Sequence, residues 1–314
     1  MQKKYDILAA GLMVYDILVS PVDASVFECD TTRINSIDYA TGGDALNVAV
    51  VAAKLGMKVA MSGVVGEDMP GRTLREEAEK HGVDTAGVCI SERNKTSVSI
   101  VMRSGGERHF AYYGEANDEF DDSYISDELL AESKLLYIGS MMALKGLEGD
   151  GLARLFKRAH KFGTLTAMDS TWTNDGIWMP KLEAALPHTD IFIPSSYEAK
   201  ELSGSDDPAE TVRFLHEKGV KIAGVKMGKQ GVYVEGTMLP AFNCDNVIDT
   251  TGAGDSFMSG FVSGIVLGME PAEAALLGSA VSNHCIRKVG AATANCTLED
   301  AKKTIEAHLN GTLR

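Results

Sequence analysis

Short apolar segments alternate along this chain with longer segments of helical periodicity, and this alternation restricts the fold more than any other feature. YDILAAG at 5–11 is typical of a buried strand, whereas 45–56 places Leu46, Val50 and Ala53 on one helix face and ends at Gly56. Repeated units of this kind predict an α/β fold, with a mostly parallel sheet covered by helices on both faces. Further strands are predicted at 58–66, 134–140, 164–170, 190–195, 221–228 and 231–236, and further helices at 72–82, 151–163 and 208–219.

Two stretches break the alternation. Residues 16–40 and 92–113 favour β structure without helical periodicity, and in the second the sequence SGGE between SIVMR and HFAYY indicates a hairpin turn. We interpret both stretches as a small β-sheet that forms a lid on the main body; two ordinary surface hairpins are the alternative. Because the chain shows no internal repeat and no linker, we expect residues 1–314 to form a single domain.

Charge and composition exclude several classes of protein. Lys and Arg number 30 and Asp and Glu 44, so the net charge of −14 disfavours nucleic acid and anionic membrane surfaces as partners. An anionic small molecule remains compatible with a local basic patch. No apolar run reaches the roughly 20 residues of a membrane span, and Asp6 and Asp16 interrupt the apolar N-terminal stretch, which argues against a signal peptide. The five dispersed cysteines contain no CxxC pair and favour a reducing, cytoplasmic location.

The strongest chemical signal is VIDTTGAGDSF, which begins at residue 247. Asp249 and Thr251 end an apolar stretch, and Gly252-Ala253-Gly254 then opens a helix with Asp255 in its first turn. Small residues and the positive end of the helix dipole together form an anion hole. A carboxylate beside a bound phosphoryl group can accept a hydroxyl proton. The alternative is that Asp255 only caps the helix.

A second signal lies in ATGGDALN, at residues 40–47. Gly42 and Gly43 allow the backbone to approach a ligand closely, and Asn47 can offer a donor and an acceptor to a polyol.

The chain has no GxxxxGK[ST] motif, no GxGxxG after the first strand, and neither HExxH nor GxSxG. P-loop and dinucleotide-binding functions therefore have no support.

Together, GGxxxN and DTxGAGD closely resemble the PfkB/ribokinase family of ATP-dependent sugar kinases. The resemblance covers essentially the whole chain and implies a ribokinase-like three-layer α/β sandwich with a β lid. It also implies ATP and Mg²⁺ as cofactors and phosphoryl transfer to a hydroxymethyl group of a sugar. In this resemblance Asp255 is the catalytic base, and Gly252, Ala253 and Gly254 supply the amides that stabilise the transferring phosphoryl group.

The same resemblance assigns residues to the acceptor. Asp16 matches the sugar-binding aspartate of the family, and Gly42, Gly43 and Asn47 would bind the acceptor beside Asp255. The alternative for Asp16 is an acidic residue that merely begins a lid strand.

On the nucleotide side, KMGKQG resembles the loop that contacts the ATP phosphates and ribose, through Lys226, Gly228 and Gly231. An exposed lysine at a strand end is the alternative for Lys226. Residues 276–294 resemble the segment over the adenine, where Ser279 aligns with the usual position and Asn283 lies one turn further on the same face.

Two metal assignments follow from the resemblance. Glu198 matches a glutamate that organises Mg²⁺ through water, although Ser195 replaces the usual asparagine; an ordinary helix N-terminal acid is the alternative. Backbone oxygens of Asp249 and Thr251 match a K⁺ site, so K⁺ activation is an expectation.

The lid carries aromatic residues in alternation. His109, Phe110, Tyr112 and Tyr113 should place two of their side chains inward, against a sugar or in a lid-to-lid contact. Because an open lid sheet has exposed edges, the resemblance favours a homodimer formed through the lid.

The identity of the acceptor stays open at this level. Thr171 replaces an asparagine typical of fructokinases and ketodeoxygluconate kinases, and Asp44, Met141 and Met142 depart from ribokinases. A nucleoside kinase of the same family is the first alternative, and a sugar-binding regulator without catalysis is the second. A sugar-phosphate kinase would need basic residues near the acceptor, and the lid offers Arg33, Arg103 and Arg108.

Overall fold

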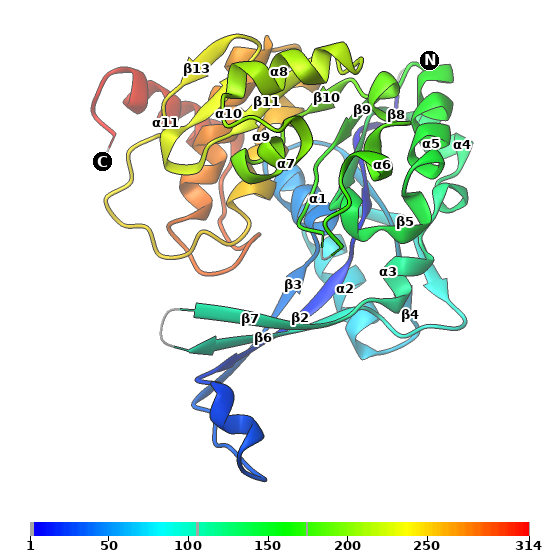
Figure 1. Cartoon of the computed structure of the whole chain (residues 1–314), viewed down its shortest axis with the longest axis vertical. Helices are drawn as coiled ribbons and strands as arrows, with labels where there is room; N and C mark the ends of the chain where they lie inside the picture. Colours follow the sequence, from blue (N-terminus) through cyan, green and yellow to red (C-terminus); the bar gives the residue numbers. More distant parts are fainter. Residues whose placement is uncertain (1–2, 105–106, 174, 314) are drawn as a thin grey trace.

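The computed structural model describes residues 3–104, 107–173 and 175–313, and for residues 107 and 108 it describes only the backbone. These residues form two β-sheets, a large one in the body and a small one that projects from it (Figure 1). The strands of the large sheet are β1 Tyr5–Gly11, β4 Val59–Gly66, β5 Asp84–Ser91, β8 Ser133–Gly139, β9 Leu165–Met168, β10 Ile191–Phe192, β11 Ile222–Lys226, β12 Val232–Val234 and β13 Thr237–Leu239.

The large sheet has the order β13-β12-β11-β10-β9-β8-β1-β4-β5. Its pairs from β5 to β11 are parallel, and only β12 and β13 are antiparallel to their neighbours. The chain progresses in opposite directions from the junction of β1 and β8. In open sheets such a junction leaves a crevice at the carboxyl ends of the strands, where ligands bind.

Helices cover both faces of the large sheet, as the alternation of the sequence predicts. Along β1, Leu8 and Ala10 are buried in one core and Ile7 and Ala9 in the other, because successive side chains of a strand point to opposite faces. The first core includes α3 Glu115–Glu119, α4 Asp127–Glu132, α5 Asp150–Lys161, α6 Met179–Leu182, α7 Ser196–Ser203 and α8 Pro208–Glu217; the second includes α1 Asp44–Lys54, α2 Met69–Lys80, α9 Ala253–Val266 and α10 Pro271–Cys285. Outside α1 and α10, α11 Leu298–Leu309 adds a third, smaller core.

The small sheet confirms the predicted lid sheet. It has the order β3-β2-β6-β7 and consists of β2 Val14–Ser20, β3 Ser36–Gly42, β6 Val98–Ser104 and β7 Glu107–Tyr113. Both β-rich stretches contribute two strands, and a 3₁₀ helix at Ala24–Phe27 lies between the first two. The glycines of the predicted SGGE turn, Gly105 and Gly106, lie outside the described residues.

Sequence periodicity missed two strands. β5 carries Asp84, Thr85 and Gly87 among its apolar residues, so it lacks a continuous apolar run, and β13 has three residues only. Within the described residues, no helix combines the length and apolar character needed to cross a bilayer.

Candidate active site

Asp255 lies in the first turn of α9, where the residue is 9% exposed. Nδ2 of Asn47, from the first turn of α1, donates a hydrogen bond of 2.7 Å to Oδ2 of Asp255. Gly252 occupies the N-cap position, so the carboxylate bonds to Asn47 rather than capping its own helix. Burial, followed by the negative charge of Asp44, raises the pKa of Asp255 well above its usual value.

The turn before Asp255 requires glycine. Gly252 has a φ of 73°, and a Cβ there would lie 2.4 Å from Cα of Ala291. Within the same turn, the N–H of Ala253 donates to the carbonyl of Thr250 at 3.2 Å. One of the three amides assigned to the anion hole is therefore already used by the turn.

Lys226, at the end of β11, reaches the start of α9. Its Nζ lies 3.9 Å from the position that a Cβ on Gly254 would take, and it donates to the carboxylate of Asp169, just after β9. Burial raises the pKa of Asp169 to about 7, although the positive charge of Lys226 acts to lower it. Burial lowers the pKa of Lys226, but Asp169 and Glu198 outweigh it and the net shift is upward. A positive charge is thus held beside the helix terminus.

The residues assigned to the acceptor lie together near the start of α1. Asp16 lies in β2, and Gly42 approaches it so closely that a Cβ on Gly42 would lie 2.3 Å from Oδ2 of Asp16. Gly43 has a φ of 92°, and a Cβ on it would collide with the carbonyl of Leu12. Burial and the charge of Asp44 raise the pKa of Asp16 to about 6. The two glycines therefore bring Asp16 and the start of α1 together.

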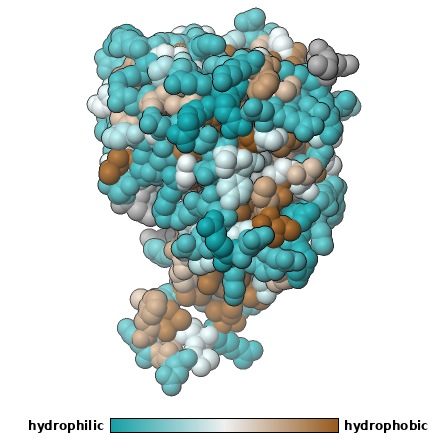
Figure 2. Space-filling model, turned by 90° about the vertical axis from the view of Figure 1, so that its right-hand side faces the viewer, coloured by the Kyte–Doolittle hydropathy of each residue, from teal (hydrophilic) through white to brown (hydrophobic). Residues whose placement is uncertain are grey.

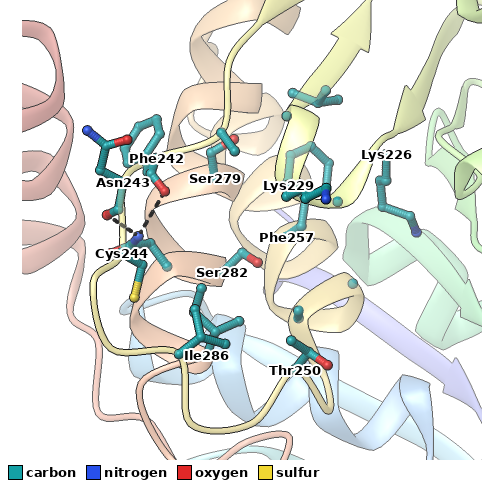
Figure 3. A pocket seen from close by; sticks show the side chains of 18 residues that line it. Lys226, Lys229, Phe242, Asn243, Cys244, Thr250, Phe257, Ser279, Ser282 and Ile286 are labelled. Carbon is teal, nitrogen blue, oxygen red and sulfur yellow. Dashed lines mark hydrogen bonds between the residues drawn. The ribbon is translucent and has the colours of Figure 1, made fainter. Parts of the chain in front are cut away.

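A cavity of about 540 Å³ lies beside the anion hole and extends along α10 (Figure 3). It is lined by all the residues assigned to ATP: Lys226, Gly228, Gly231, Ser279 and Asn283. Asn283 is already engaged, because its Nδ2 donates to the carbonyl of Asn243 at 3.0 Å and so ties the opposite loop to α10. Sequence reasoning missed the loop itself, whose residues Phe242, Asn243 and Cys244 line the cavity together with Ser282 and Ile286.

Glu198 lies in a capping box at the start of α7. Its Oε2 accepts from the N–H of Ser195 at 2.7 Å, and Oγ of Ser195 accepts from the N–H of Glu198 at 3.4 Å. The Glu198 side chain therefore caps the start of α7, which was the alternative to a role near Mg²⁺. Its negative charge also raises the pKa values of Lys226 and Asp169. Within the described residues, no group of three or more His, Cys, Asp or Glu side chains could hold a metal. A Mg²⁺ ion here would therefore depend on phosphate oxygens and water for most of its ligands.

Asp249 and Thr251 are ordered by local hydrogen bonds. Oδ1 of Asp249 accepts from the N–H and Oγ1 of Thr251 at 2.9 and 2.6 Å, and Oδ2 accepts from the N–H of Gly290 at 3.1 Å. The carbonyl oxygens of Thr251 and Ala291 both lie 3.4 Å from Sγ of Cys285. Both carbonyl groups thus accept from the thiol of Cys285 beside the start of α9.

The lid register divides its aromatic residues between two faces. Asp16 pairs with Ser99, which pairs with Tyr112, so Tyr112 shares the face of Asp16, and Phe110 lies two residues along on the same face. His109 and Tyr113 lie on the opposite face. All four side chains are exposed in this structure.

A comparison with protein families gives a match over most of the chain. The model of the pfkB family of carbohydrate kinases matches residues 6–298. The chain belongs to the PfkB family. It is thus an ATP-dependent carbohydrate kinase, as its two motifs predict.

Among PfkB relatives, the ATP-dependent 6-phosphofructokinase of Thermoanaerobacterium thermosaccharolyticum is 29% identical over 298 residues, which cover 92% of this chain and 90% of the relative. The ribokinase of Haemophilus influenzae is 26% identical over 289 residues, covering 88% and 91%. The structure of Arabidopsis thaliana ribokinase complexed with ribose and ATP matches with a TM-score of 0.83 at 23% identity, over 98% of this chain and 99% of that one. This likeness confirms the ribokinase-like fold.

Proposed function

We propose that this PfkB kinase transfers the γ-phosphoryl group of ATP to a hydroxymethyl group of a sugar, with Asp255 as the catalytic base. The observation that carries this proposal is the position of Asp255: a buried carboxylate, hydrogen-bonded by Asn47, at a helix N-terminus that Lys226 also approaches. Its raised pKa makes the carboxylate a stronger base than an exposed aspartate.

The acceptor hydroxyl gives its proton to Asp255 while its oxygen forms a bond to the γ-phosphorus, and the bond from phosphorus to the bridging oxygen breaks to release ADP. Lys226 and the amides of Gly252 and Gly254 stabilise the negative charge that passes between the two oxygens. Asp16, Gly43 and Asn47 orient the acceptor, and the lid excludes water from it.

ATP and Mg²⁺ fit the residues present. We assign the adenosine part to the cavity along α10 and the phosphates to Lys226, Gly228 and the start of α9. Bound Mg²⁺ would neutralise phosphate charge, with Glu198 acting on it through water. We assign K⁺ to backbone oxygens of Asp249 and Thr251. The putative ribokinase II of Escherichia coli, 20% identical to this chain, has been solved with ATP and Mg²⁺, which supports these two cofactors.

The substitution Asp255→Asn tests the base. It keeps the size of the side chain but removes the proton acceptor, so we expect kcat to fall by about 10²–10⁴-fold while the affinity for ATP stays close to that of the wild type. ADP formation with Mg²⁺–ATP across pentoses, hexoses, sugar phosphates and nucleosides, together with calorimetric ATP titration, measures both. Turnover of the variant close to that of the wild type would refute the assignment, and a nucleoside as the preferred acceptor would favour the nucleoside-kinase alternative.

A further inference from the structure

A second cavity lies at the base of the lid, and none of the roles above uses it. Its volume is about 460 Å³, a size that fits a small organic ligand. Among the described residues, those that line it come from β2, β3, α1, α2 and the loop 290–295, and none of them lines the cavity along α10. Tyr15 is one of them. Because Tyr15 and Asp16 are successive residues of β2, the cavity lies on the face of the lid away from Asp16.

Lys54 brings a positive charge to this cavity. It is the last residue of α1, and its Nζ donates to the carbonyl of Ala292 at 2.6 Å and to that of Ala294 at 3.4 Å. In the described part of the chain its hydrogen-bond partners are thus neutral carbonyl groups, which leave its charge uncompensated. An ammonium group has three N–H donors, so Lys54 can hold the loop and still donate to a ligand.

The surroundings of Lys54 favour an anion. Glu77 is the one carboxylate among the described lining residues, and its Oε1 lies 3.4 Å from Nε2 of His81 and 3.2 Å from Nζ of Lys80. Burial lowers the pKa of Lys54, Glu77 opposes this shift, and Lys288 and Lys80 add to it. The positive side chains around this cavity therefore outnumber the negative ones, although the chain as a whole is acidic.

The remaining lining residues suit a polyol. Thr41 from β3, Thr73 from α2 and Thr293 from the loop bring hydroxyl groups, which can both donate and accept hydrogen bonds. The rings of Tyr15 and Tyr39 lie with their centroids 5.9 Å apart and add apolar surface. A phosphate group has several oxygens that can accept from different donors at once. A phosphorylated polyol therefore matches both the cation and the hydroxyl groups.

Two of the segments around this cavity also hold Asp255 in place. The helix that ends at Lys54 carries Asn47, whose Nδ2 donates to Oδ2 of Asp255. The loop that Lys54 binds contains Ala291, and Gly252 passes so close to it that a Cβ on Gly252 would lie 2.4 Å from Cα of Ala291. A ligand bound to Lys54 would fix the end of α1 and this loop relative to each other, and would thereby act on the active site from the far side.

We propose that this cavity is a regulatory site for a small sugar phosphate, and that Lys54 binds its phosphate group. Because the ligand would stabilise the arrangement that holds Asp255, it should strengthen the binding of nucleotide, and nucleotide should strengthen its own binding by the same factor. This inference goes beyond the proposed function, since the binding can be measured without turnover.

Isothermal titration calorimetry with ribose 5-phosphate and glucose 6-phosphate tests the site. The titrations are made at constant ionic strength with Mg²⁺ and a non-hydrolysable ATP analogue present, so that the phosphate-binding groups at the start of α9 are occupied. Inorganic phosphate and citrate are titrated in the same way. We expect one of the sugar phosphates to bind the wild type more tightly than either simple anion, and Lys54→Gln to weaken its binding by about tenfold or more.

Two further variants keep this result interpretable. Lys161→Gln removes the same charge at the exposed last residue of α5 and should leave the affinity unchanged. Thr73→Phe fills the cavity from α2 while Lys54 stays in place, so it should abolish the binding even if Lys54→Gln does not fold. A sugar phosphate that bound in the acceptor region instead would keep its affinity in both Lys54→Gln and Thr73→Phe, and this result would overturn the proposal.

The affinity for the ATP analogue, with and without saturating sugar phosphate, measures the regulation. We expect it to rise about fivefold or more in the wild type, as is typical of coupled sites, and to stay constant in Lys54→Gln. An unchanged affinity in the wild type would overturn the regulatory role. The site itself is overturned if neither sugar phosphate binds, if Lys54→Gln and Lys161→Gln lose the same affinity, or if inorganic phosphate or citrate binds as tightly as the sugar phosphates.

Discussion

At the scale of single residues, the acceptor region concentrates carboxylates whose pKa values are raised in the folded protein. For Asp16 the pKa rises to about 6, from burial first and from Asp44 second. The folded state then binds its proton more tightly than the unfolded state does. This contribution to the free energy of unfolding is fully present below the unfolded pKa of about 4 and is lost as the pH rises through about 6.

Asp16→Asn should therefore stabilise the ligand-free protein at pH 8 and have little effect near pH 4, while it impairs sugar binding. The melting temperature of both proteins, measured from pH 4 to pH 8 without ligands, checks this. An equal difference in melting temperature at both ends of this range would show that the carboxyl group is not titrating as described. A stabilised but less active variant is the expected trade-off at a binding site.

Sequence reasoning identified site residues that belong to a short sequence motif more readily than residues that only the fold brings together. Asp255, Gly42 and Asn47 belong to two short patterns, so their roles could be hypothesised without coordinates. Asp169 lies at the end of the strand predicted at 164–170 but was not assigned to the site, since its ion pair with Lys226 joins residues 57 positions apart. The position of Asp169 at the carboxyl end of a parallel strand was the available signal.

At the scale of elements, α9 depends on the conformation of the residue before it. The helix starts correctly only if Gly252 keeps its positive φ and passes close to Ala291. The start of α9 could be predicted from its motif, whereas the loop with Phe242 and Asn243 could not, because it has neither periodicity nor a turn signature. Its position comes from tertiary hydrogen bonds to Asn283.

Gly252→Ala should lower the free energy of unfolding by about 2 kcal/mol or more, because it adds both backbone strain and a collision. Catalysis should fall as well, since the anion hole is displaced. Gly268→Ala, just after the other end of α9, is the matched control: its φ is 84°, but a Cβ there meets nothing within 4 Å. Urea denaturation of both variants separates the collision from the strain, and equal losses would mean that the contact with Ala291 is relieved without cost.

At the scale of the whole molecule, the lid exposes apolar side chains on the face opposite Asp16. Ile17 pairs with Tyr39 and with Ile100, and Tyr39 is 60% and Ile100 41% exposed. Figure 2 shows hydrophobic side chains on the narrow part that projects below the body. We propose that a second copy of the chain covers this face.

That residues 1–314 form one domain stays a prediction.

Ile100→Lys should convert the proposed dimer to a monomer, because it places a charge at the centre of the apolar lid face. Sedimentation velocity at micromolar concentration measures the mass of each species. Phe162→Lys replaces an exposed apolar residue after α5 in the body and should leave the dimer intact. A wild-type protein that sediments as a monomer would contradict the proposal.

The way the lid joins the body has a consequence for how such proteins can diverge. Two excursions of the chain build it, one between β1 and α1 and the other between β5 and α3. Asp16 pairs with Ala40 and Ser99, close to where these strands leave the body, whereas the tip around Phe27 projects into solvent. Insertions, deletions or an attached fluorophore at the tip would leave the acceptor contacts in place. Evolution can therefore remodel the outer part of the lid while the residues proposed to bind the sugar stay under a separate constraint.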